Sequence, residues 1–440
     1  MNEHYDIVIV GAGPAGLSAA RAAARSGARI AVLDDNPHAG GQVWRQGPAH
    51  PPRDALRERL AALAGYASQI TLWPSTRIVA PLDARGLLVE SAERGGATIT
   101  YDRLILAIGA RERLLPFAGW TLPGVTGAGG LQALIKGGMP VRGERIVIAG
   151  SGPLLLAAFA TARDAGAQVL AVVEQAPQAA LVRFGVSLAV TPSKLWQAFQ
   201  LTHGFVGSRY WSGSVVRAAH GAERVEAVEI RRADGRAVTL ACDRVACGYG
   251  LTPNVEVARA LGCTIRADGS IAVDDAQRTS VDGVYAAGEC TGVGGVELAC
   301  VEGAIAGWAA GGGTGSSSTR DAARLRTQRA RWQRFAARLH TAFALGEAAL
   351  ATPPDDTLLC RCEDVTCGEV RAQPDWRGAR LHTRCGMGAC QGRVCGTAVQ
   401  TLFGWDMAQW RPPFGATRIG TLMVADGAPV AERGDAAARV

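Results

Sequence analysis

The residues with the clearest potential for chemistry are cysteines near the C-terminus. They include a Cys-X-Cys pair at Cys360 and Cys362 and a Cys-X4-Cys pair at Cys390 and Cys395. Two short loops of this kind can supply four thiolates, the soft ligands that an iron–sulfur cluster requires. Zinc is the alternative occupant, although zinc knuckles more often have Cys-X2-Cys spacing. The pattern therefore favours a [2Fe–2S] cluster over a zinc ion.

The same region offers a rival thiol and backbone hydrogen-bond donors. Cys385 lies five residues before Cys390, so spacing alone also permits these two cysteines to act as a pair. Gly386, Gly388 and Gly392 can expose backbone N–H groups, which hydrogen-bond to cluster sulfur and tune its potential. We therefore expect a glycine-lined cluster site in which the role of Cys385 stays open.

A glycine-rich turn near the N-terminus could bind a dinucleotide. A short apolar strand, residues 6–10, runs into GAGPAG, and a helix of small residues then leads to a second strand that ends at Asp34. Gly11 suits the tight turn, Gly13 the approach to a pyrophosphate, and Gly16 the packing of helix on strand. Asp34 follows Gly11 by 23 residues, where its carboxylate can accept a hydrogen bond from a ribose hydroxyl. The expected contacts in the turn are Gly11, Ala12, Gly13, Pro14, Ala15 and Gly16.

A second unit of the same kind begins at Arg145. Its strand leads into GSGPLL, an alanine-rich helix and a strand that ends at Glu174. Leu155 stands where the third glycine belongs, so we expect it to push the helix away from the strand and to spoil the pyrophosphate seat. No arginine follows Glu174 closely enough to bind a 2′-phosphate. The unit therefore predicts a second dinucleotide-type domain in which nicotinamide binding is doubtful and NADP is disfavoured.

The whole chain is large enough to position these sites in separate domains. It has 440 residues, 48% of them hydrophobic, which is enough for roughly three domains with buried cores. The formal net charge is +7, and only 19% of the residues are charged. This composition does not indicate the clustered basic surface that a nucleic-acid-binding protein needs. No signal peptide opens the sequence, and the apolar stretches end before the ~18 residues of a membrane span. We expect a cytoplasmic protein without a transmembrane segment; peripheral attachment to the inner face of the membrane stays open.

The later elements supply a turn, a linker and a basic helix. Residues 279–307 indicate a strand, a turn with a carboxylate at Glu289, and a glycine-opened helix whose N-terminus offers free N–H groups. From Gly311 the sequence becomes GGGTGSSST, which predicts a flexible linker. Residues 320–340 then carry seven arginines against the single acid Asp321. This predicts a surface helix with a solvated basic face; a docking helix for an acidic partner is the alternative.

The N-terminal motifs together resemble a family of flavoproteins. They are the GAGPAG turn with its acid, LILAIGARER around Gly109, AGGQVWR with Gly41 and Gln42, and YAAGE with Gly288 and Glu289. These segments are similar to those of FAD-binding, glutathione-reductase-like flavoproteins, which have two dinucleotide domains. The resemblance extends over residues 1–310.

That resemblance implies one FAD across the first domain. The pyrophosphate would lie at the GAGPAG turn and the ribose at Asp34. The family usually has an aspartate at the position of Glu289, where it holds the ribityl chain, and Glu289 is a longer homologue. The flavin ring would lie near Gln42 and near the start of the helix at Val296.

The C-terminal segment resembles a small ferredoxin domain. Residues 357–405 are similar to the bacterioferritin-associated-ferredoxin-like (BFD-like) [2Fe–2S] domain, in the form fused to flavoproteins, where Cys-X-Cys precedes GMGXCQGXXC. The resemblance implies four cluster ligands, Cys360, Cys362, Cys390 and Cys395. Cys385 and Cys367 are then spare cysteines.

The predicted fold class is α/β, with two Rossmann-like dinucleotide domains and a small C-terminal BFD-like [2Fe–2S] domain. The FAD-binding domain is expected in two parts, residues 1–118 and 269–310, on either side of an NAD-binding-like domain. The remaining boundaries are 119–268 for the NAD-binding-like domain, 311–356 for the linker and basic helix, 357–405 for the [2Fe–2S] domain and 406–440 for a C-terminal extension.

The combination resembles the FAD and [2Fe–2S] α subunits of heteromeric amino-acid dehydrogenases. This family includes the A subunit of opine oxidase, the flavoprotein subunit of hydrogen cyanide synthase, and the α subunits of hydroxyproline and proline dehydrogenases. The resemblance implies an FAD-dependent oxidoreductase that passes electrons from amine oxidation to an acceptor. It also implies two partners: a flavoprotein subunit that oxidises the amine, together with a small ferredoxin-like subunit. We therefore expect no residue that catalyses amine oxidation in this chain.

Two alternative functions stay open. The second βαβ unit would suit a self-contained NAD(P)H-dependent reductase with FAD and an iron–sulfur cluster. An iron–sulfur carrier with an inert flavoprotein fold is the non-enzymatic alternative. Disulfide reduction is not expected, because Cys242 and Cys247 are five residues apart and fall on opposite faces of a strand.

Overall fold

The first domain is built on a mainly parallel sheet. The computed structural model describes residues 2–48, 50–83, 85–202, 209–313, 316–406 and 411–425. The sheet has the strand order β3-β2-β1-β6-β5-β4, with β17 paired to β6. Its parallel strands are β1 (Asn2–Val10), β2 (Ile30–Leu33), β3 (Ile70–Trp73), β6 (Gly95–Leu106) and β17 (Val284–Ala286). The antiparallel edge is formed by β4 (Thr76–Leu82) and β5 (Gly86–Ser91).

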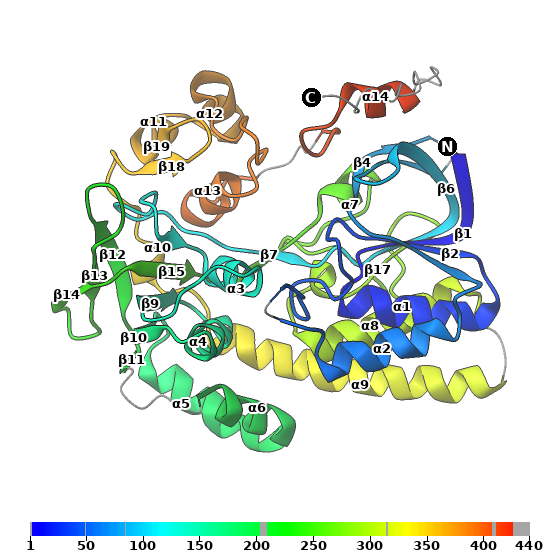
Figure 1. Cartoon of the computed structure of the whole chain (residues 1–440), viewed down its shortest axis with the longest axis horizontal. Coiled ribbons are helices and arrows are strands. Elements are labelled where there is room, and N and C mark those ends of the chain that lie inside the picture. Colours follow the sequence, from blue (N-terminus) through cyan, green and yellow to red (C-terminus); the bar gives the residue numbers. More distant parts are fainter. Residues whose placement is uncertain are drawn as a thin grey trace, which may run out of the picture.

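Helices cover one face of this sheet (Figure 1). They are α1 (Pro14–Ala23), α2 (Asp54–Ala64) and α8 (Val296–Ala310). A Cβ at Gly303 would lie 2.0 Å from the Ala15 carbonyl oxygen, and one at Gly307 would lie 2.1 Å from that of Ala19. Glycine is therefore required where α8 packs on the backbone of α1, which explains the small residues of both segments.

The second domain repeats the parallel plan. Its sheet has the order β11-β10-β9-β15-β8, and every pairing is parallel. The strands are β8 (Val125–Thr126), β9 (Arg145–Gly150), β10 (Gln168–Glu174), β11 (Arg209–Trp211) and β15 (Arg244–Gly248). Helices α3 (Ala128–Lys136) and α4 (Leu154–Asp164) pack on it with a buried apolar core. An antiparallel sheet of β12 (Val215–His220), β13 (Ala227–Arg231) and β14 (Ala237–Ala241) packs beside it.

Two short strands join the domains. They are β7 (Ala110–Glu112) and β16 (Leu251–Pro253), which pair antiparallel. A short helix, α7 (Glu256–Ala260), follows β16 into the first domain. The chain thus passes from the first domain to the second at β7 and back to the first at β16. The predicted fold class is confirmed.

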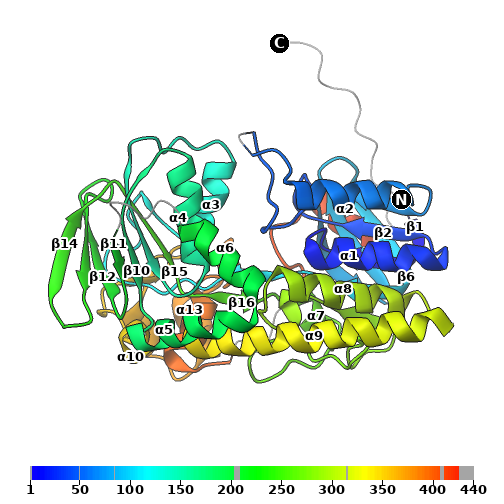
Figure 2. The same ribbon diagram turned by 90° about the horizontal axis from the view of Figure 1, so that it is seen from below.

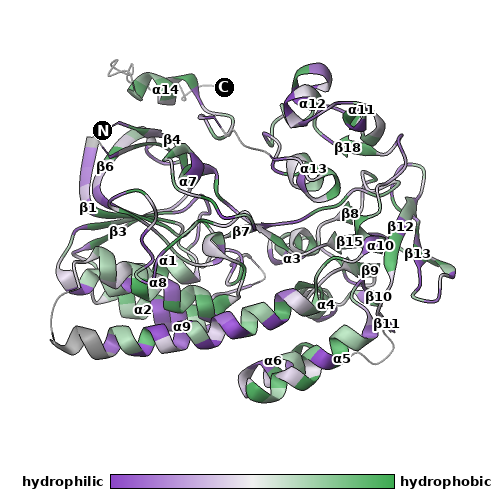
Figure 3. Cartoon of the chain, turned by 180° about the vertical axis from the view of Figure 1, so that it is seen from behind, coloured by the Kyte–Doolittle hydropathy of each residue, from purple (hydrophilic) through white to green (hydrophobic). Residues whose placement is uncertain are grey.

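One long helix spans both domains (Figure 2). This is α9 (Ser316–Ala342), and it confirms the predicted basic helix. It begins inside the stretch expected to be a flexible linker, since Ser316 and the residues after it are helical; residues 314 and 315 lie outside the described residues. Hydrophilic and apolar segments alternate along this helix (Figure 3).

Two arginines of α9 correct the expectation of a wholly solvated basic face. Arg329 is 9% exposed, and its guanidinium lies 3.6 Å from Glu302 and 3.3 Å from Asp275. Arg338 donates to the Ser187 carbonyl and the Thr191 hydroxyl of the second domain. These arginines fasten the helix to both domains. In the second domain, Arg338 contacts the end of α5 (Gln178–Ser187) and the turn before α6 (Pro192–Thr202).

The C-terminal part is a small domain and a returning helix. The small domain contains β18 (Leu358–Cys360), β19 (Val365–Thr366), α11 (Cys367–Arg371), α12 (Trp376–Thr383) and α13 (Cys395–Phe403), and α10 (Glu347–Leu350) precedes it. Helix α14 (Ile419–Ala425) then packs on β5 and β6 of the first sheet. There the Glu90 carboxylate accepts hydrogen bonds from Arg418 N–H and the Thr421 hydroxyl. Within the described ranges, no helix combines the length and apolarity needed to cross a membrane.

Candidate functional site

The first glycine-rich turn is shaped by close backbone approaches. Gly11 has φ +105°, and a Cβ there would lie 2.2 Å from the Ala107 carbonyl oxygen. A Cβ at Gly16 would lie 1.7 Å from the Gly11 carbonyl oxygen. Asp34 is buried, and its Oδ2 accepts a hydrogen bond from Ala12 N–H at 2.5 Å. The acid at the end of β2 therefore holds the turn against the sheet edge.

The other segments expected around a flavin close on the same turn. A Cβ at Gly41 would lie 3.0 Å from the Cα of Gly13, and one at Gly288 would lie 2.8 Å from the Cβ of Ala15. The side-chain oxygen of Gln42 accepts hydrogen bonds from Arg45, so this contact directs the oxygen and not the amide N–H groups toward Arg45. Stretches far apart in the sequence thus meet at one edge of the first sheet, as expected for one extended ligand.

Two carboxylates, Glu289 in the turn and Glu302 in α8, hold the turn before α8. Glu289 opens a 3₁₀ turn, η3 (Glu289–Thr291), and its Oε1 accepts from Gly295 N–H, one residue before Val296 starts α8. Burial raises the pKa of Glu289. Glu302 accepts from Gly288 N–H and from the Thr291 hydroxyl, and so fixes the same turn from within α8. The sequence motifs did not indicate Glu302, because it lies inside an apolar helix without a recognisable pattern.

Asn254 joins Gly109 to the paired strands β7 and β16, which we call the hinge between the two large domains. No sequence motif indicated this asparagine. Asn254 N–H donates to the Gly109 carbonyl at 3.0 Å, and the Asn254 amide donates to the Ile108 carbonyl at 2.8 Å. The Asn254 side-chain oxygen accepts from Arg111 at 2.9 Å. Strand β7 and the turn at Gly109 are therefore joined by hydrogen bonds through Asn254.

The second glycine-rich turn keeps the same internal bond. Glu174 accepts from Gly152 N–H at 2.8 Å, the same part that Asp34 plays in the first turn. Burial raises the pKa of Glu174 to about 7. Leu155 is 1% exposed and lies in the core formed with α3 and the sheet. The fold therefore accommodates a large residue at the third-glycine position by burying it.

The second turn is also covered by the chain itself. We call residues 343–346, which follow α9, the strap. The ring of Phe343 lies 3.9 Å from where a Cβ of Gly152 would stand, and the Phe343 carbonyl accepts from the Ser151 hydroxyl at 3.0 Å. Gln175 donates to the Ala344 carbonyl and accepts from Gly346 N–H. The strap therefore packs against the second turn at Ser151 and Gly152.

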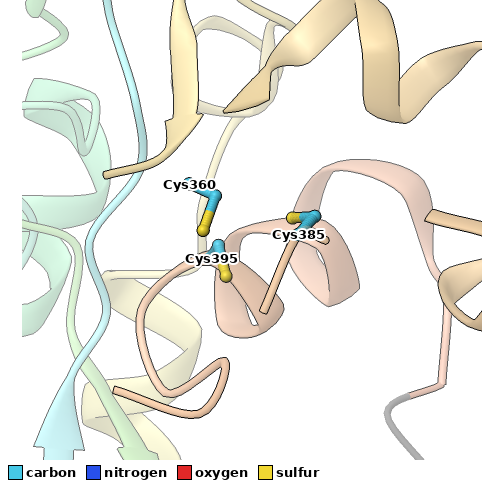
Figure 4. Close-up of side chains that lie close together, drawn as sticks. All are labelled: Cys360, Cys385 and Cys395. Carbon is cyan, nitrogen blue, oxygen red and sulfur yellow. The ribbon is translucent and has the colours of Figure 1, made fainter. Parts of the chain in front are cut away.

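The C-terminal cysteines form a compact group of thiols (Figure 4). The Sγ atoms of Cys360, Cys385 and Cys395 all lie within 4.8 Å of one another, and all three side chains are buried. The thiol of Cys362 contacts that of Cys390, and Cys390 also contacts Cys395. The four predicted ligands are thus arranged as an inner pair, Cys360 and Cys395, next to an outer pair, Cys362 and Cys390.

This arrangement fits a cluster with two irons. Each iron of a [2Fe–2S] cluster held by four cysteines takes two thiolates, and the inner and outer pairs supply two each. A Cβ at Gly388 would lie 2.3 Å from the Cβ of Cys362, so the loop can pass the outer pair only as glycine. Contacts among the thiols lower the pKa of Cys360 and of Cys390 and raise that of Cys395, so these shifts do not favour the thiolate at all four positions.

The cysteine loop is docked on the hinge between the two larger domains. Arg111 of β7 donates to the backbone carbonyl of Arg393, which lies between Cys390 and Cys395, at 3.2 Å. The same guanidinium forms an ion pair of 2.7 Å with the buried carboxylate of Glu256. Arg111 therefore connects the cysteine loop to the unit that contains Gly109. The motif around Gly109 contains Arg111, but nothing in the sequence indicated this contact.

Comparison with known proteins first defines a class. Residues 5–307 match the pyridine nucleotide-disulphide oxidoreductase family. L-Proline dehydrogenase from P. horikoshii shares the fold with a TM-score of 0.66 at 19% identity, over 96% of this chain and 80% of that chain. The class is that of flavoproteins with two dinucleotide domains, and this chain is an FAD-dependent oxidoreductase.

Similarity over nearly the whole chain gives the particular family. The A subunit of opine oxidase from Rhizobium meliloti is 35% identical over 441 residues, 90% of this chain and 92% of that protein. Hydrogen cyanide synthase subunit HcnB from Pseudomonas protegens is 30% identical over 424 residues, 88% of this chain and 89% of that protein. The chain belongs to the family that contains these two proteins, as the sequence motifs predicted.

Proposed function

We propose that this chain is the FAD- and [2Fe–2S]-containing subunit of a heteromeric amino-acid or opine-type dehydrogenase. A partner flavoprotein subunit oxidises the CH–NH donor, a small ferredoxin-like subunit completes the complex, and this chain conducts the electrons to an acceptor. The observation that carries the proposal is the docking of the paired thiols on the flavin-side hinge through Arg111. It is supported by the relatives, which are named as subunits of an oxidase and a synthase.

The residues of this chain bind and orient rather than transform a substrate. The turn at Gly11 and the carboxylate of Asp34 hold the pyrophosphate and ribose of FAD, and Glu289 and Gln42 lie at the ribityl and ring ends. Cys360, Cys362, Cys390 and Cys395 hold the cluster. Bound FAD takes electrons in pairs and a [2Fe–2S] centre takes them singly, so the two together convert two-electron chemistry into one-electron steps.

The strap supports this proposal over an NAD(P)H-dependent reductase. The alternative requires a nicotinamide dinucleotide at the second turn. There the ring of Phe343 packs against Gly152, and a buried leucine, Leu155, replaces the third glycine. Glu174 accepts from Gly152 and Ala176 N–H groups just as Asp34 accepts from Ala12 and Asn36 N–H groups, so the distinction between the turns rests on Phe343 and Leu155. Electrons are therefore expected from a partner subunit rather than from NADH.

The function is tested by following flavin absorbance under anaerobic conditions. NADH added to the purified chain should leave the flavin oxidised. Addition of the partner flavoprotein subunit with its amino-acid substrate should bleach it, and a panel of an opine, glycine and a cyclic imino acid identifies the substrate class. Rapid bleaching by micromolar NADH alone would instead establish the reductase alternative.

The cluster is tested by removing its ligands one at a time. Alanine at Cys360, Cys362, Cys390 or Cys395 should abolish the electron paramagnetic resonance signal of the reduced cluster and lower the iron and sulfide content. Cys367→Ala, which removes another buried cysteine of the same domain, should leave both unchanged. A chain that holds zinc and no sulfide would refute the cluster.

A further inference from the structure

A fifth thiol lies against the inner pair of predicted cluster ligands. Cys385 is 0% exposed, and its Sγ lies within 4.8 Å of those of Cys360 and Cys395 (Figure 4). Its thiol makes hydrogen-bond contacts with both of these cysteines. Cys385 is therefore part of the group of thiols rather than a spare cysteine elsewhere in the domain.

The end of α12 and the turn that follows it position Cys385. Helix α12 ends at Thr383, and Arg384 adopts φ 64° as its left-handed C-cap. Cys385 N–H then donates to the Thr383 hydroxyl at 3.2 Å. The next residue, Gly386, has φ +80° and lies so close to the ring of Trp376 that a Cβ would stand 2.6 Å from it. The helix end and this tight passage fix the direction of the Cys385 side chain.

If Cys360, Cys362, Cys390 and Cys395 hold the cluster as proposed, each iron would have two thiolates and two sulfides, and Cys385 would not be needed as a ligand. A thiol that keeps its proton is a donor, although a weak one, and ligand sulfurs are acceptors whose hydrogen bonds set the potential of a cluster. A buried S–H this close to ligand sulfur has such a hydrogen bond available in a site with little competing water.

We propose that Cys385 acts as an S–H donor to the ligand sulfurs of Cys360 and Cys395 and thereby raises the reduction potential of the cluster. The inference rests on the [2Fe–2S] site of the proposed function. Reduction adds negative charge to the sulfurs, so a donor stabilises the reduced form more than the oxidised form. Cys385 is in this sense a positioning and tuning residue, not a fifth ligand.

The test compares substitutions that remove the donor with one that keeps it. Cys385→Ala and Cys385→Val lack a donor, and Val also fills the space if Ala destabilises the fold; Cys385→Ser retains an O–H. Each is purified as the full chain, assayed for iron and sulfide, and titrated redox-potentiometrically with electron paramagnetic resonance detection. Cys367→Ala is the matched control, because Cys367 is also 0% exposed in the same core.

All variants should retain the iron and sulfide of the wild type. In Cys385→Ala and Cys385→Val the equilibrium constant for reduction should fall about tenfold, which is about 59 mV for a one-electron couple. Cys385→Ser and Cys367→Ala should keep the wild-type potential.

Loss of iron and sulfide from the donor-free variants, with retention in Cys395→Ala, would make Cys385 a ligand and overturn the inference. An unchanged potential with full iron content would overturn it as well. A wild-type chain without iron and sulfide would instead refute the cluster of the proposed function, which is a distinguishable result.

Discussion

The two glycine-rich turns of this chain share a strand, a helix and a carboxylate but differ in what lies on them. In the first, the loops at Gly41 and Gly288 approach the turn at the sheet edge. In the second, the strap lies on Gly152, and Leu155 is buried where a glycine would be. The internal hydrogen bond from acid to turn is the same in both. The same βαβ plan is thus compatible with quite different surroundings of its glycine-rich turn.

The largest effect is expected when the third glycine of the first turn, Gly16, is replaced by the leucine found in the second turn. Gly16→Leu places a side chain where even a Cβ would lie 1.7 Å from the Gly11 carbonyl oxygen, so the purified protein should contain almost no FAD. The measurement is the ratio of flavin to protein absorbance. Leu155→Ala changes the second turn alone and should leave that ratio unchanged. Full FAD content in Gly16→Leu and in the milder Gly16→Ala would remove the distinction between the turns.

The second-largest effect concerns pH and the buried acid of the second turn. The pKa of Glu174 rises from 4.5 to about 7 through burial, so between these values the native state keeps a proton that the unfolded chain has lost. The contribution of Glu174 to stability should therefore fall by about 3 kcal/mol as pH rises through this window. Glu174→Gln should remove this dependence, measured as Tm at the two ends of the window, whereas the exposed control Glu223→Gln should retain it. An identical slope in Glu174→Gln would contradict the assignment.

The next prediction distinguishes Asp34 from Glu174 by the effect of each on FAD affinity. Asp34→Ala removes a charge-assisted bond to the ribose and should weaken FAD retention by about 1.5–3 kcal/mol, or roughly tenfold to a hundredfold. Equilibrium dialysis against free FAD gives the affinity. The counterpart Glu174→Ala should bind FAD as the wild type does. If Asp34→Ala keeps full affinity, the ribose lies elsewhere.

The smallest effect is expected from opening the second turn. Phe343 is partly exposed, so Phe343→Ala should cost about 1–2 kcal/mol, less than the roughly 3–5 kcal/mol of a fully buried phenylalanine. NADH affinity, followed by its fluorescence, should rise only severalfold, because Leu155 still fills the third-glycine position. Phe159→Ala, which leaves the strap in place, should give no such rise. Micromolar NADH binding to the wild type would show that the strap does not exclude the dinucleotide.

The parts of this fold that local pattern specifies were predictable. Each βαβ unit is encoded within a short stretch of sequence by strand hydrophobicity, glycine spacing and a terminal acid, so both units and the basic helix follow from the sequence. The strap on Gly152, the contact of Arg111 with the Arg393 carbonyl and the packing of α14 join segments far apart in the chain. Such contacts depend on tertiary packing, which leaves no periodic trace in either partner.

The cysteine site shows the same division. The Cys-X-Cys and Cys-X4-Cys spacings indicated a metal-binding group, and the structure places Cys360 and Cys395 together with Cys385 and places Cys362 beside Cys390. Spacing could not reveal the direction of Cys385, because that depends on where α12 ends and on the left-handed Arg384. The ligand assignment itself stays a prediction until the four cysteines are substituted.

The returning helix α14 bears on how the protein is made. Residues near the C-terminus complete the first domain: Phe414 is 5% exposed in its core, and Thr421 bonds to Glu90, 331 positions earlier. Synthesis must therefore proceed past α14 before the face formed by β5 and β6 can be covered. Long-range closure of this kind slows folding and leaves apolar surface exposed during synthesis. The first domain can therefore be finished only after the two later domains that separate β6 from α14 in the sequence have been synthesised.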